Sequence, residues 1–184
     1  PNLPRFKDIK VVGYLKEKYG GYVRLENDAD ACAFAEWKYG AGKGSKNMIF
    51  LTFGTGMGAG LILDGKLYSG TNGNAGEIGH VRMRDTGPIG YGKEGSFEGF
   101  ASGGGIAQMA KSAAKEQLEK GITPLYCKSL DELSTVTAQS VAEAAYKGDK
   151  TAISVYKKCG EMLGYGLSIL IDVLNPEKIV IGSI

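Results

Sequence analysis

Four glycines at alternate positions constrain the fold of this chain more than any other feature. They are Gly54, Gly56, Gly58 and Gly60. Residues 46–53 before them form a near-continuous apolar run, which is typical of a buried strand, and residues 60–63 after them read as a second strand. The sequence therefore predicts a glycine turn that joins two antiparallel strands.

The sequence argues against two nucleotide-binding motifs, one at this turn and one at residues 40–47. A dinucleotide fingerprint needs GxGxxG followed by a helix, but the last required glycine falls on Ala59 when counted from Gly54 and on Leu61 when counted from Gly56. The segment GAGKGSKN (40–47) lacks the contiguous Gly-Lys-Ser/Thr of a Walker A loop and runs from a helix into a strand. We expect a flexible connector there.

A glycine turn of this kind has a chemical use. It can direct consecutive backbone N–H groups at one anion, and the missing side chains let a phosphate come close. Thr55 adds a hydroxyl donor. The alternative is a tight β-turn in a crowded sheet, with no ligand.

The remaining pattern mixes helices and strands. Helices are predicted over 8–19, 28–40, 104–120, 137–148 and 149–175, and strands over 22–26, 46–53, 58–63, 66–70 and 178–182. Asp8, Asn27 and Asp149 are the expected N-terminal caps, and Asp64-Gly65 is a strong hairpin signal. Residues 70–104 are Gly-rich and irregular, and residues 122–135 form a connector with a short helical turn. This order predicts a mixed α/β domain.

Acidic residues gather where the strand at 22–26 meets the next helix. They are Glu26, Asp28 and Asp30, with Asn27 between them. Carboxylates in a first helical turn are ordinary, because they suit the unpaired N–H groups and the helix dipole. The alternative is that one of them projects into a cleft and accepts a proton from a substrate hydroxyl.

The single histidine lies in GNAGEIGHV (73–81), three residues after Glu77. A lone histidine is often a structural hydrogen-bonding group. The glycines at positions 73, 76 and 79 allow a second interpretation, in which the backbone bends so that Glu77 and His80 face one ligand. The sequence by itself leaves both open.

Composition narrows the class of protein. A net charge of +2 without a basic stripe gives no support for nucleic-acid binding. Cys32, Cys127 and Cys159 are odd in number and form no CxxC pair, which favours packed thiols in a reducing, cytoplasmic setting. We see neither a secretion signal nor an apolar run of membrane-spanning length, and we expect no membrane partner.

Four segments together resemble the ROK (repressor, open reading frame, kinase) family of the sugar-kinase, actin and Hsp70-like superfamily. ENDADACAFAE resembles the family's ENDANAAALAE, and residues 51–81 resemble its phosphate-binding turn, hairpin and GxAGExGH segment. GPIGYGKEGSFEGFASG (87–103) resembles the stretch that normally reads CxCGxxGCLE, and LNPEKIVIG (174–182) resembles a late family strand. The resemblance implies an actin-like ATPase or ribonuclease H-like fold, a mixed sheet with antiparallel hairpins and flanking helices.

The resemblance also implies roles for individual residues. Asp28 matches the catalytic base that takes the proton of the sugar hydroxyl. The residues that match sugar-binding positions are Asn27, Glu77, His80 and Glu98. The residues that match the ATP-binding phosphate loop are Gly54, Thr55, Gly56 and Gly58. ATP and Mg²⁺ are the implied cofactors, and we expect Asp28, His80 and the glycine turn to face one hollow.

The chain departs from the family at its metal site. There the histidine usually ligates zinc with three cysteines, whose positions correspond to Ile89, Tyr91 and Ser96. Because these residues make no comparable zinc site, we expect no structural zinc and a His80 that serves the sugar alone. Packing of the loop by Ile89, Tyr91 and Phe97 is the expected substitute for the metal.

A second departure concerns extent. Nothing in the chain matches the DxGxT turn that binds phosphate and Mg²⁺ from the family's other lobe. We therefore expect a fragment: residues 1–27 as a helix and strand left from the N-terminal lobe, and residues 28–184 as a truncated C-terminal sugar- and phosphate-binding lobe, inactive alone. A homodimer through this lobe is a further implication.

Three functions follow from these expectations. The leading one is ATP-dependent phosphorylation of a hexose or N-acetylhexosamine at a primary hydroxyl. The first alternative is a sugar-sensing transcriptional repressor of the same family, distinguished by a winged helix-turn-helix upstream. The second alternative is a non-catalytic actin-like interaction module, which would bind no sugar.

Overall fold

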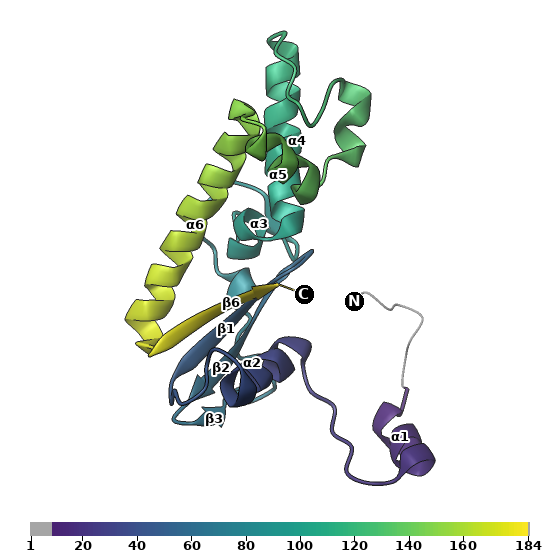
Figure 1. Cartoon of the computed structure of the whole chain (residues 1–184), viewed down its shortest axis with the longest axis vertical. Coiled ribbons are helices and arrows are strands. Elements are labelled where there is room, and N and C mark those ends of the chain that lie inside the picture. Colours follow the sequence, from purple (N-terminus) through teal and green to yellow (C-terminus); the bar gives the residue numbers. More distant parts are fainter. Residues whose placement is uncertain (1–8, 184) are drawn as a thin grey trace.

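The computed structural model describes residues 9–183 and centres on a four-stranded mixed sheet with the strand order β3-β2-β1-β6. Strand β1 (Met48–Phe53) pairs antiparallel with β2 (Met57–Leu63) and parallel with β6 (Lys178–Ser183). The short β3 (Lys66–Leu67) continues from β2 through Asp64 and Gly65, whose positive φ angles of 50° and 69° form the predicted hairpin turn. The predicted mixed α/β architecture is present (Figure 1).

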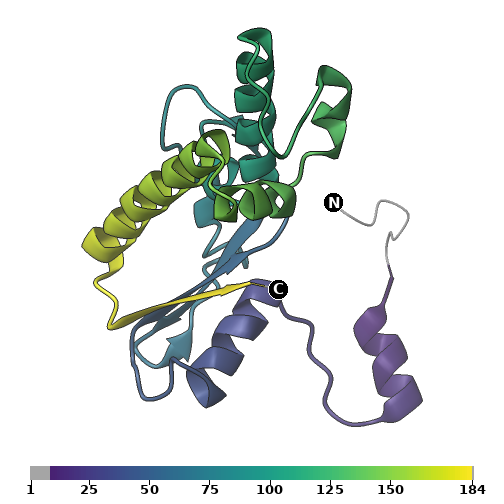
Figure 2. The same ribbon diagram turned by 45° about the horizontal axis from the view of Figure 1, so that its top comes forward.

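Both faces of the sheet are covered, which explains the continuous apolar run in β1. Met48 and Phe50 face helix α2 (Asp28–Tyr39), whereas Ile49 and Leu51 face the helical part of the chain. Successive side chains of a strand point to opposite faces, so a strand buried on both sides needs apolar residues at every position. Figure 2 shows the sheet between α2 and helix α6 (Lys150–Leu174).

The helices that follow residue 102 begin and end near the residues that local sequence signals predict. Helix α4 (Gly103–Glu119) is followed by the short helical turn η2 (Leu130–Thr135), by α5 (Ala138–Tyr146) and by α6. The Asp149 side chain caps α6 by accepting a hydrogen bond from the N–H of Ala152, and Asn175 ends the helix in the left-handed conformation. These helices pack around a second core of small apolar residues.

Short elements in the Gly-rich region were not predicted from its pattern. The structure places there the helical turn η1 (Ile78–His80), the two-residue strands β4 (Ile89–Gly90) and β5 (Lys93–Glu94), and helix α3 (Phe97–Ala101). Each is too short to show a periodicity of its own in the sequence. All of them depend on contacts with other parts of the chain.

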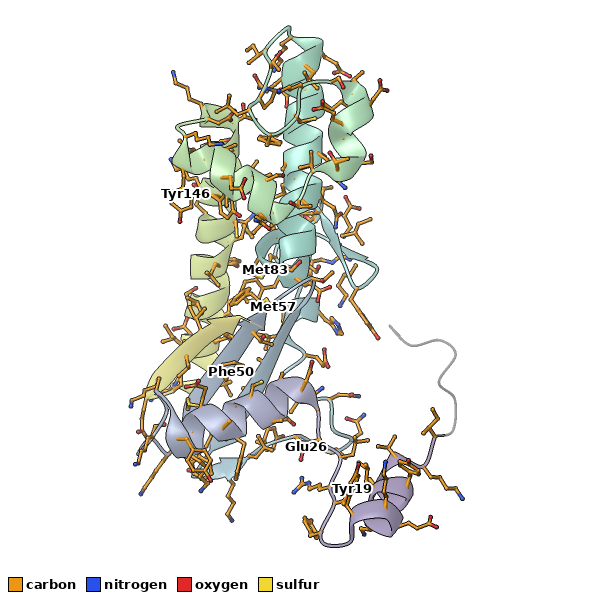
Figure 3. All side chains as sticks on the ribbon, turned by 45° about the vertical axis from the view of Figure 1, so that its right-hand side comes forward. Tyr19, Glu26, Phe50, Met57, Met83 and Tyr146 are labelled. Carbon is orange, nitrogen blue, oxygen red and sulfur yellow. The ribbon has the colours of Figure 1, made fainter. Side chains whose placement is uncertain are left out.

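The N-terminal region corrects one prediction. Helix α1 (Val11–Tyr19) forms, but none of its residues is buried and it lies apart from the body of the molecule (Figures 1 and 3). The predicted strand at 22–26 is wrong: this stretch has no regular secondary structure and no partner strand within residues 9–183, and Tyr22 and Leu25 are 87% and 71% exposed. A strand needs a neighbour for its backbone hydrogen bonds, and none is present among residues 9–183. The expected cap Asp8 lies outside the described residues.

Within residues 9–183, no helix is both long and apolar enough to cross a membrane.

The contact between α2 and β2 gives a test of stability. A Cβ atom added at Gly60 would lie 2.7 Å from the carbonyl oxygen of Ala29 and would also meet Ala33. We therefore expect Gly60→Ala to lower the free energy of unfolding by about 1–3 kcal/mol through overpacking. The matched control is Gly164→Ala in α6, where an added Cβ meets nothing; it should raise this free energy by about 0.5–1 kcal/mol. Equal effects of the two changes in chemical denaturation would contradict this account.

Candidate functional site

The glycine turn between β1 and β2 keeps two backbone donors free. The carbonyl oxygens of Gly54 and Thr55 accept hydrogen bonds from Gly103 N–H (2.9 Å) and Gly104 N–H (3.1 Å), and Gly54 N–H donates to Gly56 O (3.0 Å). The N–H groups of Thr55 and Gly56 have no acceptor within residues 9–183. With the exposed Thr55 hydroxyl, the turn therefore offers three adjacent donors to an anion.

The start of α4 is built to receive this turn. A Cβ added at Gly103 would lie 2.9 Å from Gly54 O, and one at Gly104 would lie 2.8 Å from Thr55 O. Ser102 caps the helix by accepting a hydrogen bond from Gly105 N–H (3.0 Å). Sequence reasoning did not connect this segment with the turn, although three glycines in a first helical turn, where helix propensity is poor, were a usable signal.

Glu98 lies against the turn from the first turn of α3. Its Oε2 atom accepts a hydrogen bond from Met57 N–H at 2.9 Å, and a Cβ added at Gly56 would lie 2.8 Å from the same oxygen. The carboxylate is half-buried, and its Oε1 atom has no hydrogen-bond partner within residues 9–183. Glu98 therefore supports the turn through Oε2 and keeps Oε1 as an acceptor for a ligand.

Residues 76–80 run along β2, on the part of its edge that the short β3 leaves unpaired. A Cβ added at Gly79 would lie 2.9 Å from Met57 O and 3.2 Å from the Cβ atom of Glu98, and one added at Gly76, whose φ is +88°, would meet Ala59 O. Glycine is required at both positions because the backbone comes this close to the strand. The close approach seats η1 beside Glu98 and the turn.

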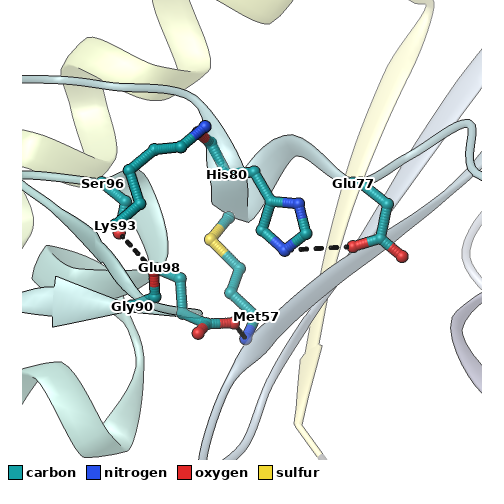
Figure 4. Close-up of polar contacts among 7 residues, drawn as sticks. All are labelled: Met57, Glu77, His80, Gly90, Lys93, Ser96 and Glu98. Carbon is teal, nitrogen blue, oxygen red and sulfur yellow. Dashed lines mark hydrogen bonds and ion pairs between the residues drawn. The ribbon is translucent and has the colours of Figure 1, made fainter.

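This segment brings Glu77 and His80 together. The Nε2 atom of His80 lies 3.6 Å from Oε2 of Glu77 (Figure 4), and the two side chains are about 30% and 46% exposed. Three predicted sugar-binding residues, Glu77, His80 and Glu98, thus form one group beside the glycine turn. An imidazole and two carboxylates in such a group can hold hydroxyls as donors and acceptors.

The other two predicted residues, Asn27 and Asp28, lie at the N-terminal end of α2, which packs on the same part of β2. Ala29 approaches Gly58, the neighbour of Met57. The Asn27 side chain caps the helix through its oxygen, which accepts from Ala29 N–H (2.9 Å) and Asp30 N–H (3.3 Å), so only its amide N–H₂ is available to a ligand.

Asp28 is exposed and one of its oxygens accepts from Ala29 N–H at 2.9 Å. Its second oxygen has no partner within the described part of the chain. No hydrogen bond or ion pair joins Asp28 to Glu77, His80 or Glu98 in that same part. A groove of about 500 Å³ between residues 87–89, α4 and α6 contains none of the predicted site residues.

A buried carboxylate behind the site was missed. Asp30 is 2% exposed, and its Oδ2 atom accepts a hydrogen bond from the Ser69 hydroxyl at 2.8 Å, whereas Oδ1 is buried and has no partner among residues 9–183. Ser69 also accepts a backbone hydrogen bond from Ala75 N–H at 3.1 Å. This pair ties the loop that leads to Glu77 and His80 to helix α2. Sequence analysis considered Asp30 as a helix-start residue or as a carboxylate projecting into a cleft, and it did not predict this buried pair.

The cysteines take no part in the site. Cys127 and Cys159 pack in the second core, and burial raises the pKa of the Cys159 thiol. A thiol held protonated in this way is a poor nucleophile. Residues 9–183 also contain no group of three or more His, Cys, Asp or Glu side chains able to hold a metal ion.

Comparisons with known proteins agree with this geometry. The ROK family model matches residues 1–184. The chain is 38% identical over 180 residues to a glucokinase of Halalkalibacterium halodurans, covering 97% of this chain and 53% of that protein. It is 29% identical to a xylose repressor of Caldicellulosiruptor bescii, covering 100% of this chain and 45% of that protein.

Solved structures give the same result. A ROK family glucokinase from Streptomyces griseus, crystallised with glucose and AMPPNP, superposes with a TM-score of 0.77 at 31% identity, covering 94% of this chain and 55% of that one. This likeness confirms the predicted actin-like fold class. The chain spans about half the length of the curated relatives it matches.

The buried Asp30 gives a test. We expect Ser69→Ala to lower the free energy of unfolding by about 1–3 kcal/mol, because the buried carboxylate loses its side-chain hydrogen-bond donor. Ser168→Ala on the exposed face of α6 is the matched control and should change it by less than about 0.5 kcal/mol. If both variants unfold at the same denaturant concentration as the original chain, the Asp30–Ser69 pair does not support the loop.

Proposed function

The chain belongs to the ROK family, and we propose that the whole protein is an ATP-dependent kinase of a hexose or N-acetylhexosamine. In this proposal residues 28–184 supply the sugar-binding face and one phosphate loop, and residues 1–27 belong with the other lobe of the enzyme. The exposed, separate position of α1 supports that division. The relatives that are glucokinases, and the structure crystallised with glucose and AMPPNP, support the reaction class.

One observation carries the proposal. The N–H groups of Thr55 and Gly56 have no acceptor within residues 9–183, Gly56 lies next to Glu98, and Glu98 lies next to Gly79, which precedes His80. An anion-binding turn and a group of hydroxyl-binding side chains therefore adjoin on one strand. Phosphoryl transfer to an alcohol needs this combination, because the enzyme acts mainly by positioning and by stabilising charge.

The phosphates of ATP would bind at the turn. Thr55 N–H, Gly56 N–H and the Thr55 hydroxyl can donate to phosphate oxygens, and the space where a Cβ at Gly54 would stand is open, which permits close approach there. Mg²⁺ would enter bound to the nucleotide. The sugar would be held by His80, Glu77, the free oxygen of Glu98 and the amide N–H₂ of Asn27.

Asp28 would act as the general base. Its free carboxylate oxygen would take the proton of the sugar hydroxyl while the hydroxyl oxygen attacks the γ-phosphorus of ATP, and the bond from this phosphorus to the β–γ bridging oxygen would break to release ADP. A position at the start of a helix that packs on the strand bearing the turn suits this role. The neighbouring cap by Asn27 fixes the backbone that carries the carboxylate.

A sugar-responsive repressor is the second candidate, favoured by the likeness to a xylose repressor. Such a protein would bind the sugar through the same residues without transferring phosphate. Both candidates predict sugar binding, whereas an interaction module predicts none. ADP production in the presence of a hexose panel distinguishes the first two, and calorimetry with the same panel tests the third.

The base assignment is tested by Asp28→Asn in the whole protein. We expect kcat to fall by about 10²- to 10⁴-fold with little change in sugar affinity, because the amide keeps the geometry and cannot accept the proton. Asp131→Asn, an exposed aspartate of η2, is the matched control and should leave kcat unchanged. Turnover of Asp28→Asn within a few-fold of the original enzyme would exclude Asp28 as the base.

The phosphate turn is tested by Thr55→Val. Loss of a hydroxyl donor to a charged phosphate should raise the KM for ATP by about tenfold while the KM for sugar stays the same. Thr135→Val, at the exposed end of η2, serves as control. A change confined to the KM for sugar would contradict the assignment of the turn to ATP and would indicate that it binds the sugar.

A further inference from the structure

The ROK resemblance implies a zinc ion at His80, and the residues present do not fit one. Ile89 has no ligating atom, and the hydroxyl of Ser96 is fully buried and engaged twice, donating to Gly90 O (3.3 Å) and accepting from Gly99 N–H (3.1 Å). No cluster of metal-binding side chains occurs among the described residues. His80 must therefore be oriented by other means.

The loop that would carry the metal ligands is ordered by its own hydrogen bonds. Gln108 of α4 accepts from Ile89 N–H (3.0 Å) and donates to Ile89 O (2.8 Å), which fixes strand β4 to the helix. Gly95 N–H donates to Pro88 O at 3.0 Å and closes the loop at its other end. The β4–β5 hairpin is thus held without a metal.

This hairpin contacts His80 at two places. The ring of Tyr91 stacks on the imidazole, with 4.4 Å between ring centroids and 19° between ring planes. Lys93 Nζ donates to the carbonyl oxygen of His80 at 2.8 Å (Figure 4). With Glu77 near Nε2, His80 is held at its ring face, its backbone and its ring edge.

The backbone at the hairpin tip supports a specific role for the tyrosine. Tyr91 has a φ of +48° and Gly92 a φ of +72°, as in a two-residue turn that favours Gly, Asn or Asp at both positions. A tyrosine in the left-handed region is costly, and 69% of its surface is exposed, so burial does not offset the cost. Among residues 9–183, the Tyr91 side chain interacts with His80 by stacking on the imidazole ring.

We infer that Tyr91 is a positioning residue for His80: stacking by the β4–β5 hairpin fixes the imidazole plane toward the sugar in place of metal ligation. The inference rests on the proposed sugar-binding role of His80. Two residues of one hairpin, Tyr91 and Lys93, carry it. Ile89, which we expected to help pack this loop, is 53% exposed and contributes through its backbone instead.

The test separates stacking from hairpin geometry. Tyr91→Gly suits a positive φ and removes the whole side chain while keeping the turn, so the melting temperature should stay at or above that of the original protein. In the whole protein, the KM for sugar should rise about three- to tenfold with kcat nearly unchanged, whereas Tyr91→Phe keeps the stack and should match the original. Tyr146→Ala, a 93% exposed tyrosine on α5, is the control.

Proton NMR of the whole protein gives a readout independent of activity, with the His80 ring signals assigned by their loss in His80→Gln. These signals should lie upfield in the original protein and in Tyr91→Phe, and should move downfield in Tyr91→Gly. Unchanged ring signals with an unchanged sugar KM in Tyr91→Gly would overturn the inference, as would stoichiometric zinc in the purified protein. If the original protein phosphorylates no sugar, the proposed kinase function fails, and the NMR comparison still decides whether Tyr91 orients His80.

Discussion

The close approach of backbone to strand β2 is the constraint on which the rest of the structure depends. Helix α2 reaches the strand at Gly58 and Gly60, and the segment before His80 reaches its free edge through Gly76 and Gly79. A side chain at any of these positions would meet backbone or side-chain atoms of the neighbouring segment. Because protein interiors are close-packed, such contacts tolerate little adjustment, and they set where every side chain of the candidate site lies.

The glycine turn keeps free backbone N–H groups because its other polar backbone groups are already hydrogen-bonded. Its carbonyl oxygens are taken by the first N–H groups of α4, and Met57 N–H is taken by Glu98. The N–H groups of Thr55 and Gly56 keep no acceptor within the described residues. The N-terminus of α4 consequently supports the turn and does not itself present free donors.

An imidazole such as that of His80 can be oriented by metal ligation or by hydrogen bonds and ring stacking. Zinc ligation fixes an imidazole through a strong directional bond, and a second group usually orients the ring. In this chain, the Gln108 side chain of α4 holds the β4–β5 hairpin through the backbone of Ile89, and Lys93 and Tyr91 of that hairpin contact His80.

The sequence alone determined those features that depend on near neighbours: the apolar strands, the hairpin at Asp64-Gly65, the capped helices and the membership of residues such as Asp28 and His80 in a set of motifs. It could not determine the unpaired stretch at 22–26, the fit of Gly103 and Gly104 to the turn, the Asp30–Ser69 pair or the stack of Tyr91 on His80. Turn and cap preferences act over a few residues, whereas these contacts join segments whose approach is fixed only when the whole sheet and its helices pack. The physical reason is that pairing and burial are decided by the partner, and the partner's position is a property of the tertiary structure.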